Sequence, residues 1–377
     1  MGTGTVNVDF GTGNRDTNLG GSMGGLHLGN GRFAQRCFCQ IIPNYILREL
    51  AARGHSKLRE HALRTIEQSE RLRGQRDMLA FLGAISVATP PGAKRRTIYD
   101  CQHETKLPGK LVRGEDDPAT NDRAADEAYD YSGATYDFFK SVYGRNSIDD
   151  RGMRLDSSVH YGVDYDNAFW NGMQMVYGDG DGEIFQSFTS AIEVVGHELT
   201  HGIIQCESGL IYYGQAGALN ESFADVFGVL VKQWKLKQTA AEADWLIGAD
   251  LFTKNVKAKA LRSMKAPGTA YDDPNLGKDP QPAHMKDYYN GKGDNGGVHI
   301  NSGIPNRAFY IAATQIGGYA WDPAGRIWYD ALCNRLRPTS DFRSAAKATM
   351  DSAGALCGPG SKEQQAVRSA WEQVGVI

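Results

Sequence analysis

An HExxH motif constrains this chain more than any other feature. His197 and His201 stand four residues apart in the run His197-Glu198-Leu199-Thr200-His201, so they share one face if the segment is helical. Such a face can present two imidazoles to one Zn²⁺, and Glu198 then lies beside the metal, where it can take a proton from bound water. The motif predicts a zinc hydrolase with its metal-binding helix over residues 191–204.

A catalytic zinc site needs a third protein ligand and one open position. Glu221 is the candidate, because it follows His201 by twenty residues within the helical pattern Gly217–Asp225. Asp225 lies one helical turn further on, where it can accept the second ring N–H of a ligating histidine, and Asn220 is the other candidate for this support. Two histidines at helical spacing can also be ordinary core or surface residues, but the acidic helix downstream favours the metal.

Three further blocks surround the motif: Asn167–Asn171, Tyr177–Gly182 and Asp294–Gly303. Together with HExxH they resemble the thermolysin family of neutral metallopeptidases, closely over residues 155–377 and more loosely over residues 95–155. The resemblance implies an α+β fold of two lobes, with a β-rich N-terminal lobe, an α-helical C-terminal lobe and the zinc helix between them. It also implies one catalytic Zn²⁺ with three protein ligands: His197, His201 and Glu221.

The resemblance assigns roles to the residues that act on the peptide. Glu198 is the general base and proton shuttle. Tyr212 and His299 match the residues that stabilise the oxyanion of the tetrahedral intermediate, with Asp294 orienting His299; such donors typically contribute a few kcal/mol each. Taken alone, Tyr212 would be interpreted as a packing residue.

The same resemblance predicts the substrate groove. Arg262 matches the arginine that holds the substrate carbonyl on the primed side, although alone it would be interpreted as a solvated charge at a helix end. Asn167 and the backbone of Ala168 match the groups that hold the substrate chain. The positions that line the first primed pocket are all large and apolar: Phe185, Val194, Ile247, Leu251 and Leu261. They predict cleavage before bulky hydrophobic residues.

The N-terminal part of the chain divides into a tail and a propeptide. Residues 1–35 are rich in Gly and contain few large apolar residues, so we expect a flexible tail. Residues 36–96 resemble the short propeptide of the protealysin-like branch of the family, which has Pro-Pro before an apolar residue where this chain has Pro43-Asn44-Tyr45. The basic, Pro-containing linker 88–96 predicts maturation cleavage between about residues 83 and 97.

Two cysteines of the propeptide suggest a zymogen switch. A thiolate is an excellent zinc ligand, so a thiolate of the propeptide would fill the open zinc position and block water. Cys39 is the preferred candidate because it directly precedes Gln40-Ile41-Ile42-Pro43. The alternative, that Cys37 and Cys39 are inert thiols, stays open.

The catalytic part is expected as a β-rich lobe over residues 97–205, which ends in the HExxH helix, and an α-helical lobe over residues 206–377. One helix is predicted in the first lobe, over residues 124–143. Helices are predicted in the second lobe at 219–235, 241–252, 301–317, 323–335, 341–355 and 362–374. Ligand clefts form between domains, so the active site is expected between the lobes.

Calcium is expected to be dispensable. Glu193 and Asp244 match two carboxylates of the family's double-calcium site, but the remaining positions have lost their oxygen ligands. They carry Lys232, Leu246 and Ala249. Hard cations need several oxygen ligands, so an ion pair of Lys232 with the remaining carboxylates is predicted in place of the ion.

Composition limits the partners. The net charge of −3 gives no reason to expect nucleic acid or an acidic membrane surface. The apolar run over residues 78–88 is too short to cross a bilayer. No signal-peptide pattern opens the chain, so the cytoplasm or export by a non-classical route is expected. Cys333 and Cys357 could bridge, but free thiols are the default in that setting.

These observations favour a zinc endopeptidase made as a zymogen, with peptides or proteins as substrates and its own propeptide as inhibitor. Two alternatives stay open: another HExxH peptidase, such as an aminopeptidase, and a catalytically silent zinc-stabilised binding protein. The chain shows no acidic Gly-Ala-Met-Glu-Asn-type block for a substrate amino terminus. The joint presence of Glu198, Tyr212 and His299 counts against the silent protein, because structural zinc needs none of them.

Overall fold

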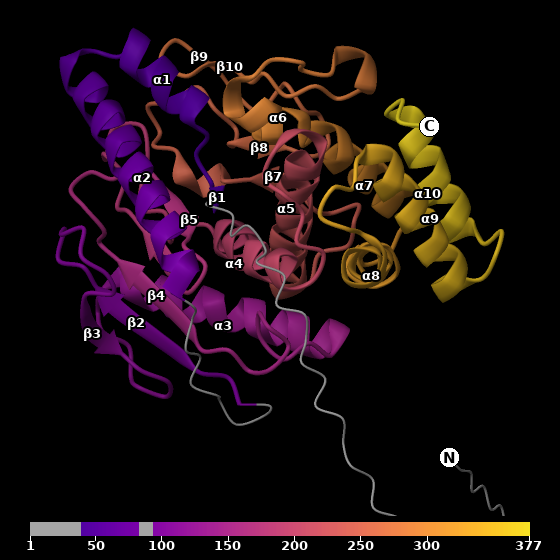
Figure 1. Ribbon diagram of the computed structural model, residues 1–377, viewed down its shortest axis with the longest axis horizontal. Coiled ribbons are helices and arrows are strands. Elements are labelled where there is room, and N and C mark those ends of the chain that lie inside the picture. Colours follow the sequence, from indigo (N-terminus) through magenta and orange to yellow (C-terminus); the bar gives the residue numbers. More distant parts are fainter. Residues whose placement is uncertain (1–38, 83–92) are drawn as a thin grey trace, which may run out of the picture. The chain divides into compact units, whose positions relative to one another are not determined.

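The computed structural model describes residues 39–82 and 93–377 (Figure 1). The predicted tail, Cys37 and most of the predicted maturation segment lie outside these residues. Within them, strands predominate before the HExxH helix and helices after it, so the α+β prediction is confirmed. No helix in this part of the chain combines the length and the apolar character needed to cross a bilayer.

The N-terminal segment contributes a short strand, β1 (Cys39–Gln40), and two helices, α1 (Asn44–Arg53) and α2 (Ser56–Leu82). Pro43 directly precedes α1 as its N-cap, with an extended backbone. Gly54 ends α1, since its N–H bonds to Leu50 O at 2.9 Å and an added Cβ would lie 2.6 Å from that oxygen. Figure 1 shows both helices, in indigo, on the flank of the sheet.

A six-stranded mixed sheet forms the first lobe, in the order β1-β5-β6-β4-β2-β3. Its remaining strands are β2 (Arg96–Asp100), β3 (Lys110–Arg113), β4 (Leu155–Val159), β5 (Ala168–Trp170) and β6 (Met175–Tyr177). Strands β2, β4 and β6 run parallel, while the other pairs are antiparallel. The edge strand β1 comes from the N-terminal segment and pairs with β5, with Cys39 opposite Trp170 and Gln40 opposite Phe169.

The helix predicted over residues 124–143 is confirmed as α3 (Arg123–Tyr143). Asp122 caps its start by accepting the N–H groups of Ala124 and Ala125, and Gly144 ends it in the left-handed conformation at φ 74°. The buried face of α3 packs against β2, β4 and the zinc helix. It therefore joins the sheet to the centre of the molecule.

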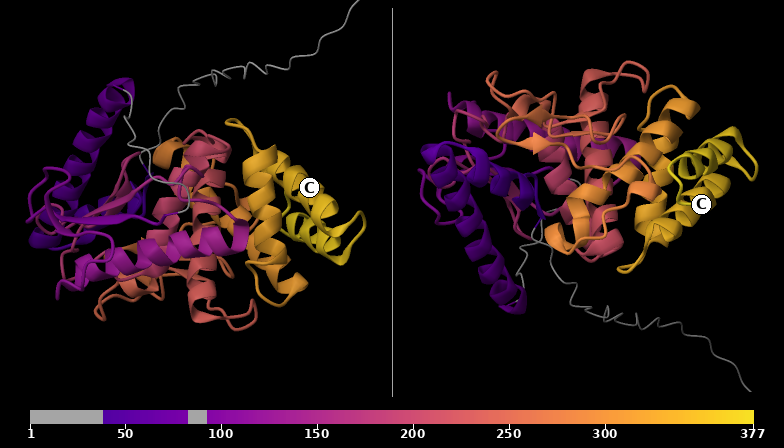
Figure 2. Two further views of the ribbon diagram at one scale, coloured as in Figure 1. Left: turned by 90° about the horizontal axis from the view of Figure 1, so that it is seen from below. Right: turned by 90° about the horizontal axis from the view of Figure 1, so that it is seen from above.

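The second lobe is helical. After α4 (Ile192–Cys206) and α5 (Gly214–Leu236) come α6 (Gly293–Asn301), α7 (Gly303–Ile316), α8 (Pro323–Asp330) with the π-helical turn η3 (Ala331–Arg335), α9 (Phe342–Cys357) and α10 (Lys362–Gln373). Figure 2 shows α9 and α10, in yellow, on the side away from α1, α2 and the sheet. Except for the helix over residues 241–252, the predicted helices of this lobe are present with shifted ends.

The helix predicted over residues 241–252 is wrong. This segment forms the short strand β7 (Leu246–Ile247) and a 3₁₀ turn, η1 (Ala249–Leu251), and β7 pairs with β8 (Arg262–Ser263). Trp245 and Gly248 have positive φ, which interrupts a helix. The remaining short elements are β9 (Asp272–Asp273), β10 (Gly277–Lys278) and η2 (Met285–Asp287).

Two glycines set the distance between the central helices. An added Cβ on Gly228 of α5 would lie 2.4 Å from Glu193 O of α4, and one on Gly196 would lie 3.1 Å from Gly228 Cα. Only hydrogen fits at these positions, so α4 and α5 can pack with their backbones in close approach.

The disulfide considered for Cys333 and Cys357 is absent, and both are free thiols.

The sheet lobe contains a histidine whose charge we expect to control stability. His160 Nδ1 lies 2.9 Å from Asp179 Oδ1, and its Nε2 lies 2.8 Å from Asp122 Oδ2. The hydrogen bond to Asp179, with support from Asp122, raises the pKa of His160 to about 9, although burial opposes the shift. Because the folded pKa exceeds the unfolded value, this stabilisation is complete below about pH 6.5 and is lost as pH rises through 9.

We expect His160→Gln to lower the free energy of unfolding by about 1–3 kcal/mol at pH 6. The difference from the wild type should shrink between pH 6.5 and pH 9. Urea unfolding at a series of pH values measures it. A loss that does not change with pH would contradict the assignment.

Candidate active site

Helices α4 and α5 bring three potential metal ligands to one point. The Nε2 atoms of His197 and His201 lie 3.0 Å apart. The carboxylate of Glu221 lies 3.6 Å from His197 Nε2 and 3.5 Å from His201 Nε2, and all three side chains are buried. Burial lowers the pKa of His201 to about 3, so its ring is neutral and keeps a lone pair for a metal.

This donor set fits a catalytic zinc. Among the described residues, Glu221 Oε2 has no hydrogen-bond partner although it is fully buried. A buried carboxylate oxygen in that state is unfavourable without a compensating cation. Two imidazoles and one carboxylate are a ligand set of catalytic zinc sites, so the residues fit Zn²⁺.

Both histidines are oriented through their second ring nitrogen. His201 Nδ1 lies 2.8 Å from Asn220 Oδ1, and His197 Nδ1 lies 2.8 Å from Asp225 Oδ1. Because each Nδ1 lies beside a side-chain oxygen, Nε2 is the nitrogen directed at the metal position. The structure thus brings Asp225 and Asn220 to the places where supporting groups are needed.

Glu198 lies in α4 beside the ligands and is fully buried. Its Oε2 accepts the backbone N–H of Trp170 at 3.0 Å, while Oε1 has no hydrogen-bond partner among the described residues. Burial, together with the negative charge of Glu221, raises the pKa of Glu198 well above its ordinary value. A carboxylate with one anchored oxygen and a raised pKa is suited to accept and release a proton.

Tyr212 and His299 meet on the other side of Glu221. The Tyr212 hydroxyl donates to Glu221 and lies 3.0 Å from His299 Nε2, while His299 Nδ1 lies 2.6 Å from Asp294 Oδ1. Burial lowers the pKa of His299, but the negative charges of Glu221 and Asp294 outweigh burial and raise it to about 9. The ring therefore carries a proton at neutral pH and can donate from Nε2.

A left-handed run of backbone places Asp294 under His299. Residues Asp294 to Gly297 all have positive φ, between 51° and 80°. The turn lets Asp294 Oδ2 accept the backbone N–H of His299 at 2.8 Å while Oδ1 holds the ring. Non-glycine residues in this region cost about 1 kcal/mol or more each, and these hydrogen bonds offset that strain.

The N-terminal segment lies along the predicted substrate groove. Ile41 N donates to Ala168 O at 3.2 Å, and Ile42 N donates to Asn167 Oδ1 at 3.0 Å. Asn167 Nδ2 in turn donates to Ile42 O at 3.1 Å. Asn167 and Ala168 therefore hold an extended main chain, and this main chain belongs to residues 41–42 of the same protein.

Arg262 completes these main-chain contacts. The side chain is buried, whereas the residue taken alone would be expected to be a solvated charge at a helix end. Its Nη1 donates to Ile41 O at 3.2 Å. Its other nitrogens donate to both carboxylate oxygens of Asp225 at 2.8 Å. One residue before Ile41, the carbonyl oxygen of Gln40 lies 3.1 Å from His299 Nε2.

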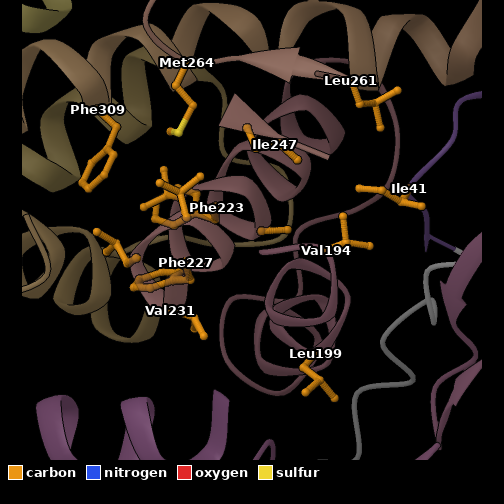
Figure 3. Close-up of a cluster of buried hydrophobic side chains, with 14 of the residues drawn as sticks. Ile41, Val194, Leu199, Phe223, Phe227, Val231, Ile247, Leu261, Met264 and Phe309 are labelled. Carbon is orange, nitrogen blue, oxygen red and sulfur yellow. The ribbon is translucent and has the colours of Figure 1, made fainter. Parts of the chain in front are cut away.

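The side chain of Ile41 belongs to the same buried apolar cluster as the five predicted pocket residues. Figure 3 draws it in that cluster with Val194, Ile247 and Leu261. This position of Ile41 was not predicted from the sequence. The available signal was the pair Ile41-Ile42 before Pro43, since β-branched residues and the position before proline favour an extended chain.

Comparison with known families agrees with this geometry. Residues 91–205 match the model described as "Thermolysin metallopeptidase, catalytic domain", and residues 208–376 match the one described as "Thermolysin metallopeptidase, alpha-helical domain". The chain belongs to the thermolysin family. It is a metalloendopeptidase, and zinc is the expected metal.

Individual relatives place it in the branch with a short propeptide. The precursor of protealysin, a metalloproteinase from Serratia proteamaculans, has a solved structure that is 55% identical, with a TM-score of 0.83 over 90% of this chain and 100% of that one. An extracellular metalloprotease of Pectobacterium carotovorum is 51% identical over 90% of this chain and 97% of its own length. A thermolysin of Alicyclobacillus acidocaldarius is 42% identical over 74% of this chain and 50% of its own length. The protealysin-like prediction is confirmed.

Removal of Asp225 tests the support of the site. Asp225→Ala leaves Arg262 buried without its carboxylate and His197 without its Nδ1 partner. We expect a loss of about 3–5 kcal/mol in the free energy of unfolding and a zinc affinity weaker by about 10–100-fold. Urea unfolding and zinc titration against a chelator measure the two effects.

The control is Asp322→Ala, which removes an exposed ion pair with Arg326. It should change the unfolding free energy by at most about 1 kcal/mol and leave zinc affinity unchanged. Equal zinc affinities in Asp225→Ala and the wild type would refute the supporting role.

Proposed function

We propose that this chain is a zinc-dependent endopeptidase made as a zymogen, which hydrolyses peptide bonds on the amino side of bulky hydrophobic residues. One observation carries the proposal. The main chain of residues 40–42 makes substrate-like hydrogen bonds in the groove, and the carbonyl oxygen of Gln40 lies 3.1 Å from His299 Nε2.

His197, His201 and Glu221 would hold the metal. When bound, zinc polarises the scissile carbonyl and lowers the pKa of a coordinated water to about 7. Glu198 takes a proton from the attacking water through Oε1, the oxygen that Trp170 leaves available, and then transfers it to the leaving amine.

Tyr212 and His299 supply the oxyanion donors. Both lie on the side of the site where the Gln40 carbonyl points, and Asp294 keeps His299 charged and oriented. Each such donor stabilises the transition state by about 3 kcal/mol, because negative charge develops on the carbonyl oxygen as the tetrahedral intermediate forms. Arg262, Asn167 and Ala168 hold the peptide main chain on the leaving side of the bond.

Ile41 indicates the specificity. It follows the carbonyl that faces His299, so its side chain stands where the first residue of the leaving fragment would lie. Ile41 belongs to the same buried apolar cluster as Phe185, Val194, Ile247, Leu251 and Leu261. Burial of such a side chain contributes about 1.5–3 kcal/mol, which favours Leu, Ile or Phe at this position.

The segment over residues 36–96 serves as propeptide and inhibitor in this proposal. Its strand β1 and the following residues fill the groove, so a substrate cannot enter until they leave. We place maturation between about residues 83 and 97, because the sequence of the linker 88–96 is basic and contains Pro, as protease-sensitive segments often do. Action outside the cell fits the name of the Pectobacterium relative, an extracellular metalloprotease.

The two alternatives fit the site less well. In an aminopeptidase the groove ends at the residue before the scissile bond, which is the N-terminal residue of the substrate. Here the groove also accepts the residue before Gln40, because Cys39 pairs with Trp170 of β5. A silent binding protein has no use for Glu198, Tyr212 and His299 beside the metal ligands. Neither nucleic acid nor membrane enters the proposal.

Activity should appear on trimming and should depend on Glu198. After limited proteolysis, we expect a quenched peptide with Leu after the scissile bond to be cleaved about 10–200-fold more efficiently than its Asp counterpart. Glu198→Gln should lower kcat/KM by at least about 100-fold, while the exposed Glu372→Gln should not change it.

Kinetics with and without 1,10-phenanthroline measure these effects, and N-terminal sequencing locates the cut. Efficient cleavage by the chain that keeps its N-terminal segment would argue against the zymogen. Preference for a charged residue after the scissile bond would argue against the pocket.

Calcium should have little effect on stability. Lys232 Nζ lies 3.1 Å from Asp244 Oδ2 and 3.6 Å from Glu193 Oε1, so an ammonium group neutralises the carboxylates that a calcium ion would need. We expect calcium added to zinc-reconstituted, calcium-depleted protein to move Tm by less than about 1 °C. Thermal unfolding across a calcium titration measures the shift, and a rise that saturates at one equivalent would show a retained site.

A further inference from the structure

Cys39 lies against the metal ligands. It is fully buried in β1, and its Sγ lies within 4.8 Å of a ring nitrogen of His201 and a carboxylate oxygen of Glu221. Cys39, His201 and Glu221 are therefore close enough to one another to share a metal ion. His197 Nε2, 3.0 Å from His201 Nε2, adds a fourth donor.

Four protein donors would fill all four coordination positions of the zinc, whereas catalysis needs one of them free for water. Zinc binds four ligands in tetrahedral structural sites, and a catalytic site keeps one position for water. Thiolates are strong zinc ligands. The fully buried Glu221 Oε2 has no hydrogen-bond partner among the described residues, and this favours a cation at this point.

The residue after Cys39 makes this closure necessary. The Gln40 carbonyl faces His299, and the Ile41 N–H and carbonyl are held by Ala168 and Arg262. These contacts would orient the Gln40–Ile41 bond for hydrolysis, with Ile41 in the apolar pocket. A peptide in this position is a substrate unless the attacking water is excluded.

We propose that Cys39 Sγ is the fourth zinc ligand of the uncut chain, and that Gln40–Ile41 is the bond the enzyme hydrolyses in itself when this thiol is absent. In that reaction one water adds across the amide, so that Gln40 ends in a carboxylate and Ile41 gains an ammonium group. The inference rests on the proposed zinc peptidase function. It explains how a strand with substrate contacts acts as an inhibitor.

Cobalt substitution tests the ligand without relying on activity. We expect the uncut wild type with one equivalent of Co²⁺ to show a near-ultraviolet thiolate-to-cobalt charge-transfer band. Cys39→Ser and Cys39→Ala should bind one Co²⁺ and lose this band, while Cys37→Ser should keep it. Absence of the band from metal-loaded wild type, or its loss in Cys37→Ser, would overturn the ligand assignment.

Intact mass tests the cleavage. Uncut Cys39→Ser with zinc should convert to a chain beginning at Ile41, at a rate independent of protein concentration, and Glu198→Gln in the same variant should prevent it. Folded, zinc-loaded Cys39→Ser and Cys39→Ala that both keep the Gln40–Ile41 bond would overturn the self-cleavage. Failure of the proposed function is separate, because trimmed wild type would then bind metal and cleave no peptide.

Discussion

The close packing of α4 against α5 is the constraint on which the site depends. Gly196 and Gly228 let the two backbones approach, and an added Cβ on Gly228 would meet Glu193 O at 2.4 Å. This contact brings His197 and His201 of one helix to Glu221 of the other. Any side chain at Gly228 would push the helices apart and separate the ligands, since packed interiors leave no room for it.

Asp225 links the metal ligands to the peptide groove. One carboxylate lies 2.8 Å from His197 Nδ1 and pairs with Arg262, which in turn holds the carbonyl of Ile41. Burial alone would raise the pKa of Asp225, but Arg262 and His197 outweigh it and lower the pKa, so the group stays charged. The buried ion pair of Asp225 with Arg262 therefore both orients His197 and positions the peptide main chain.

Local patterns and family resemblance predicted much of this arrangement. The HExxH spacing and the acidic helix indicated the ligands, because helical periodicity fixes which residues share a face. The pairing of Asp225 with Arg262 and of β1 with β5 could not be predicted, since these contacts join residues far apart in the chain. The segment over residues 241–252 was misassigned because its apolar pattern suits a helix, while Trp245 and Gly248 adopt positive φ.

Inhibition in this account uses the same contacts as catalysis, so the position of the metal relative to strand β1 is the central claim. Anomalous diffraction at the zinc edge, from crystals of the uncut chain, measures that position most directly. We expect one peak within bonding distance of His197, His201 and Glu221 while residues 39–42 still lie in the groove. Absence of a peak there, or a peak with these residues displaced from the groove, would contradict the account.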